Sequence, residues 1–373
     1  MKFFLLILFL LSMEDFGFGQ PTAPALIKKN GTTPVKYQAK TGACWCYSTT
    51  SLIESEYLRN TGKNLDLSEL YIVRNMFIEK AKRYILGLGT TPFHAGGTEQ
   101  DALYGIMNFG AIPEDFYPGK KAIENSDKSN IQLEDVLKQY LDDVLKQNPI
   151  SETWLDNFIF KLDSSLGIPP KSFIWQGRAY SPLSFARKIL KINSDDYVAI
   201  TSFTHHPFYK YVTLETPDNY LVSSRYFNLP IDELINITEM TINKGYTLVI
   251  DLDMTNNGWN CEKFGYALNL KDRPENIMNG DIQEDSANQQ IRQKLFENLV
   301  TQDDHLVHIV GLAKSAKGRK FFILKDSYKD PGGKNYSTFG GFDYISKNYF
   351  IINAISIMLP KAALSANLLK LIK

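Results

Sequence analysis

The sequence predicts an α+β fold in which a helical half and a β half lie on either side of a cleft. Apolar residues recur at helical spacing through the first half of the chain, whereas short apolar runs typical of strands dominate from Asp196 onward. Helices followed by strands favour α+β over an alternating α/β architecture. The chain has 373 residues, of which 44% are hydrophobic and 22% charged, enough for a sizeable core.

The amino-terminal end predicts a cleaved signal peptide. Lys2 precedes an apolar run at 3–11, and a Gly-Phe-Gly sequence precedes Gln20, which is the order of a leader with a small-x-small cleavage site. The run is too short to span a bilayer, and no second long apolar run follows. We therefore expect a signal peptide at 1–19 and an exported chain, periplasmic or secreted, without stable membrane insertion.

The next segment predicts three helices and a glycine-rich loop. Gly62 is a suitable carboxyl-terminal cap for the first helix, and Ser68 is a suitable amino-terminal cap for the second. A loop rich in glycine, threonine and proline precedes the third. The expected ranges are 44–62 and 68–85 for the first two helices, 87–97 for the loop and 98–108 for the third helix.

The stretch at about 120–193 predicts a helical insertion within a domain that covers 20–373. Apolar residues recur at helical spacing over 133–145, and Ser181 followed by Pro182 is a favourable helix start. The β half follows, interrupted by one helix at 231–244. Its expected strands are 197–200, 211–214, 246–251, 306–313, 321–324 and 351–359.

Only three cysteines occur, Cys44, Cys46 and Cys261, so a disulfide scaffold is excluded and at least one thiol stays unpaired. Cys44 falls in the first turn of a helix, where the macrodipole favours a thiolate. Gly42 permits close approach of another segment. The amide of Gln38 can donate to a developing oxyanion together with the Cys44 N–H. A lone cysteine would favour a buried structural role, but this combination favours a nucleophile.

A thiolate nucleophile needs a base, and the chain has five histidines. His305 opens a strand, and a hairpin centred near Ala316 would bring it opposite Asp326 or Ser327. A carboxylate on a neighbouring strand can orient an imidazole for base catalysis. His308 has the opposite parity and should face away, so the two histidines are poor joint metal ligands. Without further support, His305 would be interpreted as the end of an edge strand.

The sequence around Cys44, Q-A-K-T-G-A-C-W-C-Y-S, resembles the active-site motif of papain-like cysteine peptidases. The segment D-D-H-L-V-H-I-V-G resembles the histidine strand of that family, and K-D-S-Y resembles its following Asn-Ser-Trp segment. Gly96 and Gly97 resemble the glycine pair that lines the substrate groove. Three further segments are similar to the bleomycin hydrolase/aminopeptidase C branch, at 181–185, 206–210 and 228–231.

The resemblance implies a papain-like fold with a β-barrel-like half and a peptidase acting on a peptide or protein substrate without a cofactor. It implies that Cys44 attacks the scissile carbonyl and that His305 holds the ion pair and protonates the leaving amine. The remaining implied roles are orientation of the base by Asp326, completion of the oxyanion hole by Gln38, and substrate binding by Gly96, Gly97 and Trp45.

Two departures from the family pattern bear on activity. His305 lies 261 residues after Cys44 (305 − 44), well beyond the roughly 130–150 of plain papain-type enzymes, and the helical insertion accounts for the excess. Asp326 replaces the family's Asn and Tyr328 its Trp, so the orienting residue gains a charge and loses a donor. A papain-like protein that binds peptides without cutting them therefore remains an alternative. A thiol-redox protein or transferase using Cys44 and Cys46 is another, although their spacing is not Cys-x-x-Cys.

Charge and composition indicate which kinds of binding partner to expect. A formal net charge of zero gives no electrostatic reason to expect nucleic acid. The neighbouring His205 and His206 are interpreted as a loop feature, so no metal site is expected, and a homo-oligomer is compatible with the sequence. The tail at 362–373 is helix-forming. In the resembled branch the carboxyl terminus can occupy the cleft, which would favour aminopeptidase activity.

Overall fold

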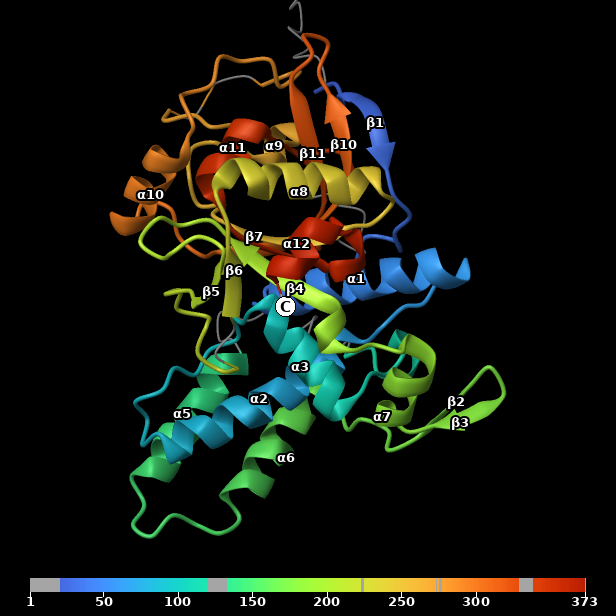
Figure 1. Ribbon diagram of the computed structural model, residues 1–373. Helices are drawn as coiled ribbons and strands as arrows, with labels where there is room; N and C mark the ends of the chain where they lie inside the picture. The colour runs from blue at the N-terminus through green and yellow to red at the C-terminus, as the bar shows by residue number, and fades with distance from the viewer. Residues whose placement is uncertain are drawn as a thin grey trace, which may run out of the picture.

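The computed structural model describes residues 21–119, 133–222, 225–272, 274, 277–328 and 338–372. Helices of one half lie at one end of the molecule and a large sheet with its covering helices lies at the other, as expected for α+β (Figure 1). The helices are α1 Cys44–Thr61, α2 Glu69–Leu86, α3 Glu99–Phe109, α5 Leu133–Leu145, α6 Trp154–Leu166, α7 Pro182–Phe185, α8 Ile231–Asn243, α9 Cys261–Phe264, α10 Gln289–Glu297, α11 Lys347–Asn353 and α12 Ala366–Leu371.

The β half is built on one mixed sheet of 11 strands. The strands are β1 Ala25–Lys29, β4 Tyr197–Thr201, β5 Lys210–Thr213, β6 Arg225–Asn228, β7 Leu248–Leu252, β8 Trp259–Asn260, β9 Tyr266–Ala267, β10 His305–Lys314, β11 Lys320–Lys325, β12 Phe342–Ser346 and β13 Ala354–Pro360. Their order is β5-β6-β4-β13-β7-β10-β11-β12-β9-β8, with β1 paired to β10. In the described residues β5 and β8 end the sheet without pairing to each other, so the expected β-barrel-like half is an open sheet.

Helix α1 lies between the two halves and buries most of its surface. Ser51 of α1 shares a hydrogen bond of 2.8 Å with Nδ1 of His308 on β10, so the His308 ring faces the middle of this helix. Leu306 and Val249 of the sheet belong to the same apolar cluster as the helical half. This shared core fixes the amino-terminal end of α1 against the start of β10.

The two helix caps predicted in the first half, Gly62 and Ser68, are confirmed, and the structure adds a third at Thr98. Gly62 ends α1 in the left-handed conformation with φ +69°. The Ser68 side chain accepts a hydrogen bond from the N–H of Tyr71 at the start of α2. Thr98 and Asp101 form a reciprocal capping box at the start of α3. These local signals explain why sequence alone placed the three helices closely.

The stretch predicted as an insertion forms α5 and α6, then a small hairpin of β2 Phe173–Trp175 and β3 Arg178–Tyr180. An ion pair of 2.6 Å between Arg74 of α2 and Asp163 of α6 ties it to the helical half. The helix expected at Ser181 has its capping box, but after one turn it continues as a π-helical turn at 186–190.

The strand expected at 351–359 begins later than predicted. Residues up to Asn353 form α11, whose start is capped by the Ser346 side chain accepting from the Tyr349 N–H, and β13 begins only at Ala354. The apolar run is continuous across both elements, because α11 and β13 are both buried. An apolar run alone does not distinguish a buried helix from a buried strand.

The carboxyl-terminal tail packs against the β half. Leu364, Leu368 and Ile372 belong to its apolar core together with residues of α8, and the Tyr211 hydroxyl donates to the Ile372 carbonyl at 3.1 Å. In the described part of the chain, the tail's hydrogen bonds run to this half and do not reach Cys44. The tail position expected from the resembled branch, inside the cleft, is therefore not seen.

Candidate active site

Cys44 is the first residue of α1 and the only one of the three cysteines that is not fully buried. The preceding cap residue, Ala43, makes no side-chain hydrogen bond to the first turn, so the N–H groups there lack the usual side-chain acceptor. Gly42 has φ +63°, and a Cβ at this position would lie 2.8 Å from the Cβ of Ala95. Only glycine therefore lets Ala95 approach the segment before Cys44 so closely.

His305 and Asp326 are in contact, as the sequence predicted. His305 Nε2 lies 2.9 Å from Oδ1 of Asp326, and both side chains are buried. Since Nε2 is engaged by the carboxylate, Nδ1 is the ring nitrogen left for Cys44, whose thiol hydrogen-bonds His305. Burial alone would disfavour the imidazolium, but the charge and hydrogen bond of Asp326 and the bond to Cys44 raise the pKa of His305 well above its ordinary value.

The register that produces this contact differs from the predicted one. The β10–β11 pairing aligns His308 with Lys325 and shifts at a bulge between Ile309 and Gly311. Continued to the end of β10, this register sets His305 level with Tyr328 rather than Asp326, and the Tyr328 ring stacks on the imidazole with centroids 5.5 Å apart. The difference arises because the hairpin is centred on Lys317, where Lys314 pairs with Lys320, one residue later than predicted. The bulge then shifts the register by one residue and brings His305 closer to Asp326.

Gln38 is oriented by the segment that follows β11. Its backbone N–H donates to the Ser327 carbonyl at 2.9 Å, and the Ser327 hydroxyl donates to its side-chain Oε1. Because Oε1 already accepts this bond, the NH₂ group is the end of the amide free to donate. Gln38 is thus held so that one end is fixed and the other can meet an oxyanion.

The glycine pair lies on a loop whose backbone is held by hydrogen bonds from Trp45 and Lys80. A Cβ on Gly97 would be 3.1 Å from the Trp45 ring, and Trp45 Nε1 donates to the Ala95 carbonyl at 2.9 Å. The buried ammonium of Lys80 donates to the carbonyls of His94, at 2.9 Å, and Gly96.

The structure corrects one expected role here. Trp45 is only 1% exposed and lies under the loop, so it has almost no surface with which to contact a substrate directly. It shapes the groove through Gly97 instead. Sequence reasoning also missed Lys80, because a lysine in an amphipathic helix is usually solvent-exposed.

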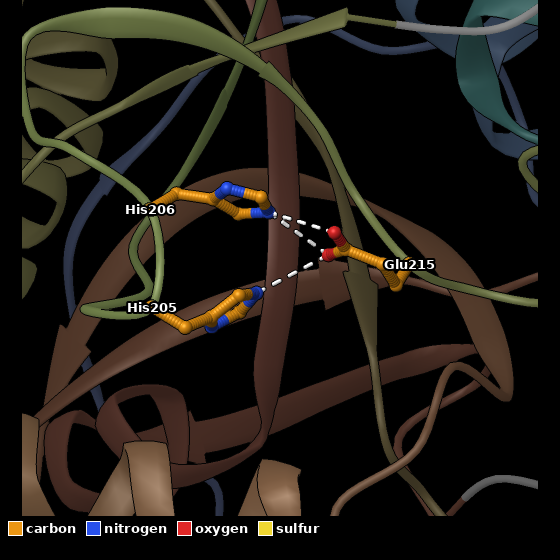
Figure 2. A group of neighbouring side chains, drawn as sticks. All are labelled: His205, His206 and Glu215. Atoms are coloured by element: carbon orange, nitrogen blue, oxygen red, sulfur yellow. Dashed lines mark hydrogen bonds and ion pairs between the residues drawn. The ribbon is translucent and has the colours of Figure 1, made fainter.

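His205 and His206 form a cluster with Glu215 on the surface of the β half (Figure 2). Both Nε2 atoms lie within 3.2 Å of the carboxylate. The Gln293 Oε1 accepts from the Thr204 N–H at 2.6 Å, so its NH₂ group faces Nδ1 of His205 at 2.8 Å. Nδ1 of His205 is then an acceptor and its Nε2 carries the proton, which suits a hydrogen bond to Glu215 better than a bond to a metal.

A thiol at a helix amino terminus beside an oriented imidazole and a tethered glutamine is the arrangement of papain-like cysteine peptidases, here with a carboxylate in place of the usual asparagine. The model of the Peptidase C1-like family matches residues 22–371, and the chain belongs to that family. It is a cysteine peptidase of the aminopeptidase C/bleomycin hydrolase branch.

The relatives agree with this assignment. Aminopeptidase G of Lactobacillus delbrueckii subsp. lactis is 21% identical over 365 residues, covering 86% of this chain and 79% of that protein. Aminopeptidase C of Streptococcus thermophilus is 21% identical over 350 residues, covering 80% and 75%. The crystal structure of PepW from Lactobacillus rhamnosis shares the fold with a TM-score of 0.74 at 18% identity, covering 94% of this chain and 85% of that one.

None of the described helices is both long and apolar enough to cross a bilayer.

Proposed function

We propose that Cys44 is the nucleophile, His305 the proton carrier and Asp326 the residue that orients it. The observation that supports this most directly is the 2.9 Å contact of His305 with Asp326 beside a partly exposed thiol at a helix amino terminus. A high pKa of His305 favours the thiolate–imidazolium pair, which is the reactive form of such a dyad.

The proposed reaction has two stages. The thiolate of Cys44 attacks the scissile carbonyl carbon, and the oxyanion that forms accepts hydrogen bonds from the Gln38 NH₂ group and the Cys44 N–H. His305 gives its proton to the leaving amine, whose departure leaves a thioester on Cys44. His305 then takes a proton from water, which attacks the thioester and releases the acid.

The test is a comparison of cysteine variants. Cys44→Ala should abolish hydrolysis of peptide amides and labelling by a thiol-directed epoxide while leaving the thermal melting curve close to wild type. Cys46→Ala is the matched control, because Cys46 is fully buried and bonds to the Glu69 carbonyl rather than to the dyad. Hydrolysis that persists in Cys44→Ala would contradict the assignment.

We further propose that the enzyme removes residues from the amino terminus of peptides, a specificity supported by two relatives named aminopeptidase G and aminopeptidase C. Product analysis on one peptide, with and without an acetylated amino terminus, tests this. Acetylation should block an aminopeptidase, whereas unchanged products would indicate an endopeptidase.

The chain is also proposed to be exported, from the leader-like sequence at 1–19, which lies outside the described residues. Expression of the full chain with its native start, followed by amino-terminal sequencing of the exported protein, tests this. A mature terminus near Gln20 would support the proposal, and retention of Met1 inside the cell would contradict it.

A further inference from the structure

Five carboxyl groups gather where α3 of the helical half meets the sheet. Two come from the first turn of α3 and one from β7. The other two come from the β5–β6 connection and from the residues just before β10. They are Glu99, Asp101, Asp251, Asp218 and Asp303.

The strand register shows why Asp251 of β7 faces Glu99 of α3. Ser356 of β13 and Leu306 of β10 both pair with Asp251 of β7, so these three residues form one row across the sheet. Leu306 lies in the core shared with the helical half, which means that the row faces that half. The Ser356 hydroxyl lies 3.4 Å from Glu99 Oε1, and Asp251 shares a hydrogen bond with Asp303.

The acidic cluster adjoins both walls of the catalytic groove. Asp303 is two residues before His305, and Glu99 is two residues after Gly97. A Cβ on Gly96 would lie 2.4 Å from Oδ2 of Asp218, so this carboxylate lies directly against the glycine pair. The cluster therefore lies next to the groove where a substrate backbone would run.

Buried oxygens in the cluster lack partners. Among the described residues, Oε2 of Glu99 and Oδ1 of Asp251 have no hydrogen-bond partner, and the two residues are 1% and 6% exposed. Within the described chain, no ion pair joins either of them, or Asp303, to a cation. The charge of Lys80 interacts with Asp101 and Asp218, but its ammonium donates its hydrogen bonds to the carbonyls of the 94–96 loop.

The electrostatics of the cluster reflect this shortage of positive charge. Burial, with repulsion among the carboxylates, raises the pKa of Glu99 to about 7 and that of Asp303 to about 7. Burial raises the pKa of Asp101 to about 6. Burial and the neighbouring Asp303 raise the pKa of Asp251 well above its ordinary range. A cation placed among these groups would remove the repulsion and let them ionise.

We propose that the acidic cluster binds a cationic group of the peptide substrate and so selects which peptides are cut. An extended peptide along Gly96 and Gly97 directs alternate side chains to opposite faces, so one of them points toward Asp218 and Asp303, the two partly exposed members of the cluster. The buried carboxyl groups of Glu99 and Asp251 lie behind them and act on the cation through their charge. The cation is an ammonium or guanidinium, supplied by a basic side chain or by the free amino terminus of a short substrate. The inference deepens the proposed function, since it concerns the specificity of the same groove.

The first experiment compares matched substrates. Amino-terminally blocked dipeptide amides with Lys or Gln as the residue before the cleaved one test the side chain, and one-residue amides with free or acetylated amines test the terminus. If the cluster binds a basic side chain, kcat/KM should be about ten-fold or more higher for the Lys substrate than for the Gln substrate. If it binds the amino terminus, kcat/KM should be higher by the same factor for the free amine than for the acetylated one. Glu99→Gln and Asp303→Asn should each lower that ratio by about ten-fold. Glu152→Gln, a change at an exposed carboxylate remote from the groove, is the control.

The pH dependence gives an independent readout. Because Glu99 and Asp303 lose their protons as the pH rises from 5 to 8 while a Lys side chain stays charged, the preference for Lys over Gln should grow over this range. Effects on the dyad cancel in a ratio of two substrates. The other titratable groups that influence the cluster are Lys80, His94, Glu134, Tyr220, Tyr226 and Asp304. Burial raises the pKa of both tyrosines and lowers that of His94, so these three stay neutral at the upper end of the range.

The outcomes separate this inference from the proposed function. An active enzyme whose preference is the same for both members of each pair, at both ends of the pH range, would overturn the inference alone. If the enzyme is inactive, anisotropy of fluorescent Lys- and Gln-containing peptides with Cys44→Ser decides the matter. Tighter Lys-peptide binding that Glu99→Gln removes would support the inference, and equal binding would overturn it. Melting curves of both carboxyl variants check that they fold.

Discussion

Ser327 should influence catalysis only through Gln38, and a double-mutant cycle can test this. The Ser327 hydroxyl donates to Gln38 Oε1, and the Ser327 carbonyl accepts from the Gln38 N–H at 2.9 Å. Ser327→Ala removes only the side-chain bond and leaves the backbone bond intact. The amide of Gln38 then loses the contact that directs its NH₂ group toward the carbonyl under attack.

The sizes of the two effects follow from the kinds of bond that are lost. Loss of an oxyanion donor in Gln38→Ala should lower kcat by about 10²–10³-fold. A neutral hydrogen bond contributes about 0.5–1.5 kcal/mol net, so Ser327→Ala should lower kcat by about 2- to 13-fold. If Ser327 acts through Gln38, Ser327→Ala should have almost no effect in the Gln38→Ala background.

Steady-state kinetics on a fluorogenic peptide amide measures all four proteins, with active-site titration to correct for the fraction of reactive Cys44. Ser164→Ala, on the exposed face of α6, is the control for a serine-to-alanine change. Equal losses from Ser327→Ala with and without Gln38 would refute the reasoning. The role of Ser327 would then be direct, through the backbone that follows Asp326.

Two further predictions concern the base and the tail. Asp326→Asn removes the negative charge that raises the pKa of His305, so the imidazolium should lose its proton at lower pH and the alkaline limb of kcat/KM should move toward neutrality. An unmoved limb would show that the carboxylate does not control this proton. Leu368→Ala opens a cavity in the β half and should cost about 2–3 kcal/mol of unfolding free energy without changing the products. New internal cleavage at unchanged stability would instead place the tail in the cleft.

The sequence by itself determined the helical half and the contact of His305 with Asp326. Caps at Gly62, Ser68 and Thr98 are local signals, because each is satisfied within one turn of its own helix. The parity of β10 separated His305 from His308 because alternation along a strand needs no knowledge of the partner strands. The contact of His305 with Asp326 could be predicted from these local rules together with the family motif.

Tertiary structure decided the features that depend on distant segments. The bulge in β10 sets the register beside His305. The run at 347–360 is buried in both α11 and β13, so its apolar pattern did not reveal that α11 is a helix. The acidic cluster forms only because α3 is packed against the row that contains Asp251. Carboxylates far apart in sequence give no sign that they will share one buried volume. Their proximity is fixed by packing of the two halves, which no local pattern encodes.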